Sequence, residues 1–428
     1  MQVVLTFSSF QQNLFNTVDI KDVKKIAVAL SGGADSMCLT FLLQEVCKTN
    51  NIEITALTVD HKLRSNSTRE ANQVFAYMQL HGIRHAILNW EHNNYLANNV
   101  QQKAREARYS LLLKYCKENN ISHLFVAHNY DDQAESVMLN ILRGSGIDGI
   151  AGIKRQTKLD DINILRPLLK FTRSQIINFL NAEKIIWFED ASNSNLKFDR
   201  VKVRQLLRQF DYNHNLVARL NLLSDNAQRA KSFLDSYVDK TFQNQCEIGD
   251  FGHISIKASY FFAQEEEIRL RLLNKIFRHV HNSVFIYPVR LESLKLLQNL
   301  LKQGGNNKFT LCKCQVLLRN GVIYFYKEGK FIEQEKVLIE GDNIWDGRYV
   351  INVKVNGFYV TKLTKEIWGQ IKPKQYKHTI PSDIIFSTPV ITSSDRNEYY
   401  WPFLNGMYSC SQDRFSTIIH VYKLAVQL

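Results

Sequence analysis

Residues 26–36 of this chain read Ile-Ala-Val-Ala-Leu-Ser-Gly-Gly-Ala-Asp-Ser, and no other segment indicates as much about the fold. The apolar run from Ile26 to Leu30 predicts a buried strand of a parallel sheet. A serine and two glycines then break the strand, and the apolar residues 37–43 predict a helix. Glycines let the backbone approach a ligand closely, and the N–H groups at a helix N-terminus favour bound phosphate. The stretch therefore predicts a phosphate-binding strand–turn–helix.

Polar side chains in this turn strengthen the prediction. Ser31 and Ser36 supply hydroxyl donors, and Asp35 can hold a metal ion on the phosphates. The turn lacks the Gly-Lys-Ser/Thr ending of a Walker loop, so it is a phosphate cradle of another kind. A glycine-rich turn without a ligand is the alternative, but it leaves both serines and the aspartate unexplained.

The first 150 residues alternate predicted strands with predicted helices. Further strands are expected at 54–60, 85–90 and 124–127, and helices from about 67, at 99–117 and at 132–143, the last closed by Gly144. Repeated strand–helix units predict an α/β fold with a doubly wound parallel sheet. Ligands of such folds bind at the carboxyl ends of the strands. The phosphate turn, Asp60-His61 and His128 all follow strands, so we expect them to converge.

Beyond residue 216 the alternation stops. Helical patterns cover 216–240 and 265–303, and tight-hairpin signals stand at Asn320-Gly321 and Asn356-Gly357. A chain of 428 residues is too long for one ordinary core. We predict a domain with the phosphate turn at 1–215, a mainly helical domain with a hairpin at 216–335, and a small mixed α+β domain at 336–428.

The composition is that of a globular protein, with 45% apolar and 22% charged residues. No long apolar stretch and no signal peptide are recognisable, which predicts a protein without a membrane anchor. Seven scattered cysteines indicate reduced thiols and a cytoplasmic location. Cys312-Lys313-Cys314 could bind a metal, but two strand cysteines facing opposite sides explain the pair more simply. The formal charge of +13 indicates a polyanionic partner.

Further segments narrow the chemistry. Residues 59–64 (Val-Asp-His-Lys-Leu-Arg) end the second strand, and residues 104–109 (Ala-Arg-Glu-Ala-Arg-Tyr) place two arginines on one helix face. Residues 127–135 (Ala-His-Asn-Tyr-Asp-Asp-Gln-Ala-Glu) put a histidine and three carboxylates at a strand-to-helix turn. Arg-Pro-Leu at 166–168, Asp-Ala-Ser-Asn at 190–193 and Asp-Arg-Val-Lys-Val-Arg at 199–204 follow.

In this order the segments closely resemble the tRNA(Ile)-lysidine synthetase family of PP-loop ATP pyrophosphatases. The shared patterns are Ser-Gly-Gly-x-Asp-Ser, Ala-Arg-x-x-Arg-Tyr, His-x-x-Asp-Asp-Gln-x-Glu, Arg-Gly-Ser-Gly, Arg-Pro-Leu and Glu-Asp-x-Ser-Asn, all within residues 26–208. The rest of the chain fits the family by length and layout alone. Val201 departs from the family, which often has an asparagine there, so a role for an amide at this position is in doubt.

The resemblance implies a two-step ligation at the wobble cytidine of tRNA(Ile) with a CAU anticodon. ATP adenylates the 2-oxo group of the cytosine and releases pyrophosphate. The side-chain amine of free L-lysine then attacks the activated ring carbon, and AMP departs. The product, lysidine, changes codon recognition from AUG to AUA. The implied cofactors are ATP and Mg²⁺, and a homodimer is an expectation at the level of the family. The resemblance also implies that 1–215 is the ATP-binding catalytic domain, 216–335 a tRNA- or substrate-binding domain and 336–428 a tRNA-binding domain.

The resemblance also implies roles for particular residues. Asp35 and Asp132 would share the Mg²⁺, and Arg108 and His128 would donate to the α-phosphate or AMP. Glu135 or Asp131 would attract the lysine ammonium group, and spacing does not decide which carboxylate takes its proton. The predicted ATP site is Ser31, Gly32, Gly33, Ala34, Asp35 and Ser36; the predicted catalytic residues are Asp35, Arg108, His128, Asp132 and Glu135; the predicted tRNA-binding residues are Arg166, Arg200, Lys202 and Arg204.

Structural alternatives exist for several of these residues. Arg105 and Arg108 could be solvated or ion-paired, His128 could be a structural histidine, and Asp131 could merely cap a helix. Residues 154–208 contain twelve Lys or Arg against six Asp or Glu, which fits a solvated face as well as a track for tRNA phosphates. The C-terminal tryptophans are expected in the core, with stacking on RNA bases as the alternative.

Two other functions use similar features. A tRNA sulfur transferase would need a persulfide cysteine or paired Cys-x-x-Cys motifs, and the sequence has neither. A non-catalytic RNA-binding protein that retains an ATP fold has no use for metal-binding carboxylates, so intact Asp35 and Asp132 favour the enzyme.

Overall fold

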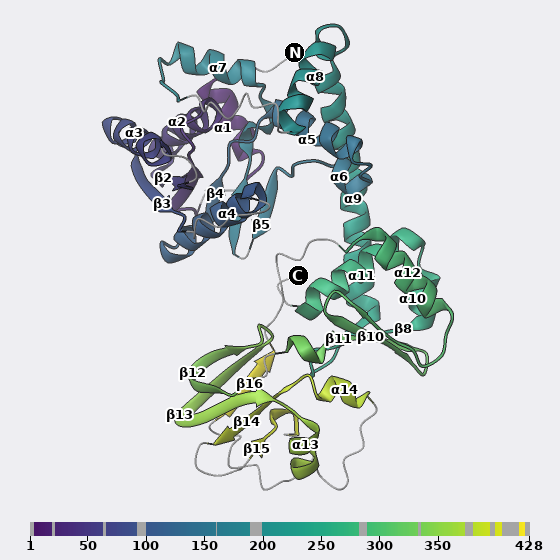
Figure 1. Cartoon of the computed structure of the whole chain (residues 1–428). Coiled ribbons are helices and arrows are strands. Elements are labelled where there is room, and N and C mark those ends of the chain that lie inside the picture. The colour runs from purple at the N-terminus through teal and green to yellow at the C-terminus, as the bar shows by residue number, and fades with distance from the viewer. Residues whose placement is uncertain are drawn as a thin grey trace. The chain divides into compact units, whose positions relative to one another are not determined.

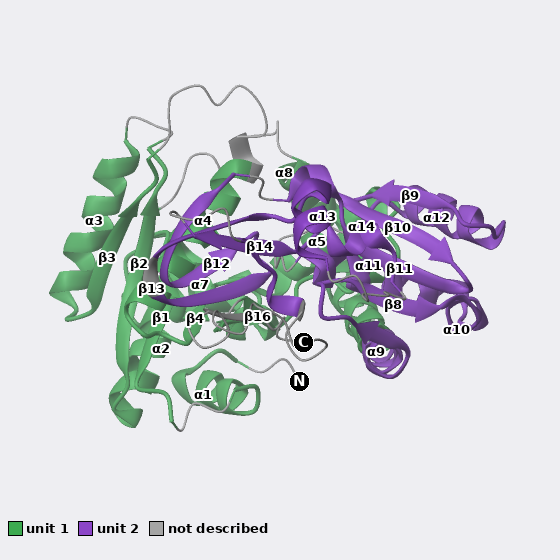
Figure 2. Cartoon of the chain, turned by 90° about the horizontal axis from the view of Figure 1, so that it is seen from below, with its two compact units in different colours: residues 1–232 green, residues 233–428 purple. Residues whose placement is uncertain are grey.

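The computed structural model describes residues 4–18, 22–62, 66–91, 100–159, 161–188, 199–281, 289–332, 335–372, 380–393, 399–404 and 419–423. The chain separates into two compact units, residues 1–232 and residues 233–428 (Figures 1 and 2). None of the helices in these ranges is long and apolar enough to cross a membrane.

Unit 1 is built on a six-stranded sheet with the order β3-β2-β1-β4-β6-β5. All neighbours pair in parallel except the edge strand β5, which is antiparallel to β6. The predicted α/β class with a parallel sheet is therefore confirmed. The strands are β1 Lys25–Ala29, β2 Glu53–Asp60, β3 Arg84–Asn89, β4 His123–Phe125, β5 Gln156–Leu159 and β6 Ile162–Leu165.

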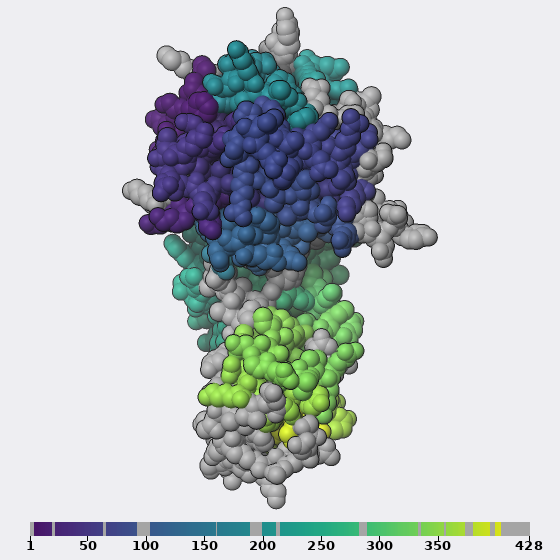
Figure 3. Space-filling model, turned by 90° about the vertical axis from the view of Figure 1, so that its left-hand side faces the viewer, coloured from purple at the N-terminus to yellow at the C-terminus, as the bar shows by residue number. Residues whose placement is uncertain are grey.

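Helices cover both faces of this sheet because side chains of the central strand β1 alternate between them. Ile26 and Val28 pack with buried residues of α1, α2, α3 and α7, whereas Ala27 packs with α4. Helix α3 and strand β3 belong to the dark-blue surface in Figure 3. The helices of this unit are α1 Phe7–Phe15, α2 Ala34–Asn50, α3 Ser67–Leu80, α4 Val100–Glu118, α5 Tyr130–Leu142, α6 Ile147–Ile150, the 3₁₀ turn η1 Pro167–Lys170, α7 Arg173–Ala182 and α8 Asp199–His214.

The 30-residue helix α9, Leu216–Gln245, begins in unit 1 and ends in unit 2. Unit 2 then contains two antiparallel sheets, β7-β8-β11-β10-β9 and β12-β13-β14-β15, with β16 also paired to β13. The elements are β7 Cys246–Ile248, β8 Ile254–Lys257, α10 Ala258–Ala263, α11 Glu266–His281, α12 Leu291–Lys302, β9 Lys308–Leu311, β10 Cys314–Arg319, β11 Val322–Lys327, β12 Val337–Trp345, β13 Tyr349–Lys362, α13 Lys365–Ile371, α14 Ser382–Ile385, β14 Pro389–Ser393, β15 Tyr399–Tyr400 and β16 Ile419–Lys423. The three-domain division stays a prediction.

One of the two hairpin predictions is confirmed and the other is wrong. Asn320 and Gly321 both have positive φ and join β10 to β11, as a two-residue hairpin requires. Asn356-Gly357 instead lies inside the continuous strand β13, which pairs with β12 on both sides of it across an irregular register. The hairpin between β12 and β13 turns at Asp346-Gly347, where both φ angles are positive.

In unit 2 the prediction for the tryptophans is confirmed, and the prediction for one of the two neighbouring cysteines is wrong. Trp345, Trp368 and Trp401 are buried, which confirms their place in the core. Cys314 starts β10 and is buried, but Cys312 lies in the turn before it, with positive φ, rather than in a strand. A turn residue has no strand face, so the explanation of two opposite-facing strand cysteines was wrong for Cys312.

Candidate active site

The turn after β1 requires glycine at one of its two glycine positions. Gly32 has φ of +82°, and a Cβ built there would lie 2.7 Å from Cγ2 of Val74 and 3.4 Å from Cδ2 of Phe188. Gly33 has φ of −71°, and its Cβ would meet only Oγ of Ser31, at 3.7 Å. The fold therefore requires glycine at position 32 but not at position 33, and the close approach of a ligand to Gly33 stays a prediction.

Gly33 is also the N-cap of α2, and no side chain caps this helix end. The first N–H groups of a helix have no partner within it, and they carry the positive end of its dipole. The turn therefore offers backbone donors to an anion at Ala34, Asp35 and Ser36. This geometry is compatible with the predicted phosphate cradle, and phosphate binding at the turn stays a prediction.

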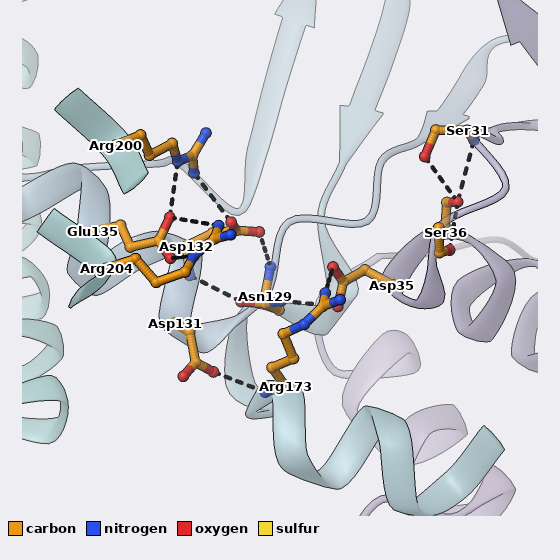
Figure 4. A network of polar contacts seen from close by, with 11 residues as sticks. Ser31, Asp35, Ser36, Asn129, Asp131, Asp132, Glu135, Arg173, Arg200 and Arg204 are labelled. Carbon is orange, nitrogen blue, oxygen red and sulfur yellow. Dashed lines mark hydrogen bonds and ion pairs between the residues drawn. The ribbon is translucent and has the colours of Figure 1, made fainter. Parts of the chain in front are cut away.

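The two serines of the turn hold its shape. Ser36 is buried, and its hydroxyl donates to the carbonyl oxygen of Gly33 at 2.9 Å. The same hydroxyl oxygen accepts from the backbone N–H of Ser31 at 3.2 Å and lies 3.1 Å from the hydroxyl of Ser31 (Figure 4). The proton of Ser36 is committed inside the loop, so Ser31 is the better placed of the two to reach a ligand.

Asn129 links the phosphate turn to the first turn of α5 (Figure 4). Its side-chain amide donates to Oδ1 of Asp35 at 2.9 Å, and its carbonyl oxygen accepts from the backbone N–H of Asp132 at 2.8 Å. Asp132 returns the contact, because its Oδ2 accepts from the backbone N–H of Asn129 at 3.0 Å. The two predicted metal-binding aspartates thus contact one buried residue, although 97 positions separate them in the chain.

Two arginines of α8 hold the buried carboxylate of Glu135. Arg204 donates to its Oε1 at 2.6 Å and to its Oε2 at 3.2 Å, and Arg200 donates to Oε2 at 2.9 Å. Arg200 also pairs with Oδ1 of Asp132 at 3.1 Å. Only 4% of the Glu135 side chain is exposed, so both of its oxygens are occupied by these guanidinium groups.

Two carboxyl groups of α5, those of Asp131 and Asp132, have raised pKa values. Burial raises the pKa of Asp132 to about 6, although Arg200 and the N–H of Asn129 lower it. Burial also raises the pKa of Asp131, whose Oδ2 accepts from the backbone N–H of Arg173 at 2.7 Å. Asp131 does not cap α5, because Asn129 does. Perturbed carboxyl groups of this kind are typical of functional sites.

Arginines also surround His128 and Tyr109. The guanidinium carbons of Arg105 and Arg108 lie 5.5 Å and 5.4 Å from the centre of the Tyr109 ring. Burial, together with four arginines at positions 105, 108, 166 and 200, holds the pKa of His128 well below its usual range. The imidazole is therefore neutral at pH 7, and the concentrated positive charge beside it suits an anionic substrate group.

The four predicted tRNA-binding residues have different surroundings. Arg200 and Arg204 are ion-paired as described, and Arg166 donates to the carbonyl oxygen of Lys154 and the hydroxyl of Thr157, both at 3.0 Å. Lys202 is exposed, with Asp199 at 3.9 Å. The motif residues 189–193 lie outside the described residues.

Two residues of this site were not among the sequence predictions. They are Asn129, which connects Asp35 to Asp132, and Arg173, which pairs with Asp35. For Asn129 a signal existed, since an asparagine three residues before Asp132 has the spacing of a reciprocal helix cap. Arg173 opens α7, and its guanidinium pairs with Oδ2 of Asp35. No local pattern connects residues 138 positions apart, so this contact needs the fold.

The donor set around Asp35 and Asp132 fits Mg²⁺ bound together with substrate. Mg²⁺ usually takes one or two carboxylates and completes its shell with phosphate oxygens and water. Both oxygens of Asp35 and both oxygens of Asp132 already accept hydrogen bonds, so Mg²⁺ would use their remaining lone pairs. Within the described ranges no cluster of three or more His, Cys, Asp or Glu residues could hold a metal without substrate.

Comparisons with known proteins identify the relatives of this chain. Residues 6–210 match the family model of the PP-loop domain. A tRNA(Ile)-lysidine synthase from Wolbachia pipientis wMel is 36% identical over 350 residues, which are 81% of this chain and 80% of that protein. Another, from Wolbachia sp. subsp. Brugia malayi (strain TRS), is 32% identical over 402 residues, covering 92% and 93%.

Among solved structures, the U34-tRNA thiolase NcsA from Methanococcus maripaludis is 21% identical, with a TM-score of 0.45. The match covers 52% of this chain and 78% of that chain. A likeness of this size says nothing about function.

Proposed function

Because this chain belongs to the tRNA(Ile)-lysidine synthase family and is therefore an ATP-using PP-loop ligase of tRNA modification, we propose that it joins free L-lysine to the wobble cytidine of tRNA(Ile) with a CAU anticodon. The products would be lysidine, AMP and pyrophosphate, and the tRNA would then read AUA instead of AUG. The observation that carries this proposal is the Asp35–Asn129–Asp132 link, which joins the phosphate turn to the carboxylate helix α5.

The first step forms a bond between the 2-oxo group of the cytosine and the α-phosphorus of ATP, and pyrophosphate leaves. The backbone donors of residues 34–36 are suited to bind the phosphates, and Arg108 beside neutral His128 is suited to stabilise charge on the α-phosphate. Mg²⁺ on Asp35 and Asp132 would neutralise phosphate charge and favour pyrophosphate as leaving group. Phosphoryl transfer depends on such positioning and charge stabilisation more than on covalent help.

The second step forms a bond between the side-chain nitrogen of lysine and C2 of the activated cytosine, and AMP leaves. The ammonium group must lose a proton before attack, so a carboxylate must lie near it. The geometry favours Asp131 over Glu135, because both oxygens of Glu135 already accept from arginines. Asp131 has a raised pKa, which suits a proton acceptor.

A cavity of about 420 Å³ beside Asp131 supports a lysine site in unit 1. The volume is in the range of small-molecule sites. Its lining combines carboxylates for the ammonium groups, arginines for the carboxylate and apolar side chains for the methylene chain: Asp131, Glu135, Arg173, Ser174, Ile177, Asn178, Arg204, Leu207, Arg208 and Val217.

The tRNA would be bound through its phosphates. The excess of 54 Lys and Arg over 41 Asp and Glu supports this, because backbone contacts supply most non-specific affinity for nucleic acids. Exposed Lys202 is a better phosphate contact than Arg200 or Arg204, whose charges Asp132 and Glu135 already balance. A cytoplasmic location and a homodimer belong to the same proposal.

The test is transfer of labelled lysine to purified tRNA. We expect label in tRNA(Ile) with a CAU anticodon only when ATP is present, and almost none in methionine tRNA with the same anticodon. Asp131→Asn should raise the KM for lysine, while the same change at an exposed surface aspartate such as Asp225 should not. No incorporation, or equal incorporation into both tRNAs, would overturn the proposal.

A further inference from the structure

We propose that Arg173 is a positioning residue of the ATP site, which fixes the carboxylate of Asp35 and balances its charge. The inference rests on the ATP-binding part of the function and not on the tRNA substrate. It arises from two contacts of Arg173, one made by its backbone and one by its side chain.

The backbone of Arg173 is anchored to the helix that carries the other carboxylates. Its N–H donates to Oδ2 of Asp131 at 2.7 Å. Arg173 is the first residue of α7, and a reciprocal cap between Thr172 and Gln175 fixes that helix end. The starting point of the side chain is therefore determined by α5 and α7 together.

From this anchor the guanidinium reaches α2, where it pairs with Oδ2 of Asp35 (Figure 4). The other oxygen of Asp35 accepts from Asn129 at 2.9 Å. Asp35 is thus held from two sides, by the buried amide of Asn129 and by a guanidinium whose backbone is anchored, and 24% of its side chain remains exposed. A charge-assisted pair of this kind selects one orientation of the carboxylate.

The charges around Asp35 explain why this contact affects ATP. The network contains four carboxylates at 35, 131, 132 and 135 and three arginines at 173, 200 and 204. Arg200 and Arg204 pair with Asp132 and Glu135, so Arg173 is the cation that the described contacts give to Asp35. Without it, the triphosphate of ATP would meet one more uncompensated negative charge. A divalent metal ion on Asp35 would restore that balance.

The two roles of Arg173 predict a dependence on Mg²⁺ that a purely structural residue would not show. Binding of α,β-methylene ATP to the full chain is measured by titration calorimetry, with EDTA or with saturating Mg²⁺, without tRNA or lysine. Arg173→Met should weaken binding about tenfold in EDTA, because the triphosphate then meets the uncompensated charge of Asp35. In Mg²⁺ the loss should shrink to less than about threefold, since the metal replaces the missing charge.

Arg173→Lys keeps the charge and should bind within about threefold of the wild type in both conditions. Arg155→Met is the matched control, because it breaks an exposed pair with Asp225 and removes the same charge outside the network. Wild-type affinity of Arg173→Met in EDTA would overturn the proposal. Equal losses for both Arg173 variants in EDTA and Mg²⁺ would also overturn it, by showing a structural role. If Arg173→Met fails to fold, the same comparison is made with Arg173→Gln. Neither of the two overturning results would bear on the proposed lysidine formation, because the binding assay contains no tRNA and no lysine.

Discussion

The two adjacent glycines of the phosphate turn allow its steric and ligand requirements to be tested separately. Gly32→Ala places a side chain at φ of +82°, with Cβ 2.7 Å from Val74. The left-handed backbone costs about 1–2 kcal/mol, and the overpacking adds about 1–2 kcal/mol. Gly32→Ala should therefore lower the free energy of unfolding by about 2–4 kcal/mol.

Gly33→Ala should leave stability almost unchanged. Its φ of −71° suits alanine, and the nearest atom to its Cβ is Oγ of Ser31 at 3.7 Å. Alanine is a poorer N-cap than glycine, but it also reduces the entropy of the unfolded chain, and these terms offset each other to within about 1 kcal/mol. The added methyl group instead occupies the side of the turn from which phosphate would approach, so binding of α,β-methylene ATP should weaken at least about tenfold.

Urea denaturation and titration calorimetry measure the two quantities on the same samples. We expect Gly32→Ala to lose stability. Gly33→Ala should lose nucleotide affinity and stay folded. If Gly33→Ala bound the nucleotide as tightly as the wild type, the turn would not be the phosphate site. A Gly32→Ala variant as stable as the wild type would refute the steric part of the account.

Three further predictions concern the rest of the chain. Burial raises the pKa of Asp132 to about 6, above its unfolded value, so this group contributes stability below pH 4 that is lost as the pH rises through 6. The free energy of unfolding of Asp132→Asn, taken relative to that of the wild type, should therefore rise by about 2–3 kcal/mol between pH 4 and pH 7 in denaturant titrations. A difference that does not change with pH would contradict this. Lys202→Ala should weaken tRNA binding and reduce the slope of log K against log salt by about one in filter-binding assays, and an unchanged slope would exclude the contact. Gly152→Ala should lower stability by about 2–4 kcal/mol, because φ is +63° and a Cβ would lie 2.6 Å from a buried glutamine oxygen. Gly144→Ala, with φ of +67° and open space around it, should lower stability by only about 1–2 kcal/mol. Thermal unfolding of both variants measures the difference.

The sequence predicted the ATP-binding unit well because its signals are local. An apolar strand, a break at Gly32 and a following helix occupy neighbouring residues, and the alternation of such units implies a parallel sheet. The hairpin predicted at Asn320-Gly321 was correct for the same reason. At Asn356-Gly357 the same local signal was wrong, because pairing with β12 on both sides carries β13 straight through it.

The contacts inside the site could not be predicted in the same way. Arg173 and Asp35 meet because α7 and α2 pack on one face of the sheet, and nothing near either residue in the sequence indicates the other. Asp131 and Glu135 were equivalent candidates for the lysine ammonium on spacing alone. We infer a preference for Asp131 from the ion pairs of Glu135 with two arginines, and these pairs depend on how α8 packs against α5.

In the proposed reaction, one site couples cleavage of ATP at the α-phosphate to transfer of lysine. A single-turnover reaction with labelled ATP, lysine and tRNA(Ile) carrying a CAU anticodon, in which all products are counted, tests this coupling. We expect equal amounts of AMP, pyrophosphate and lysine-modified tRNA. Formation of ADP and phosphate, or of AMP without lysine on the tRNA, would contradict it.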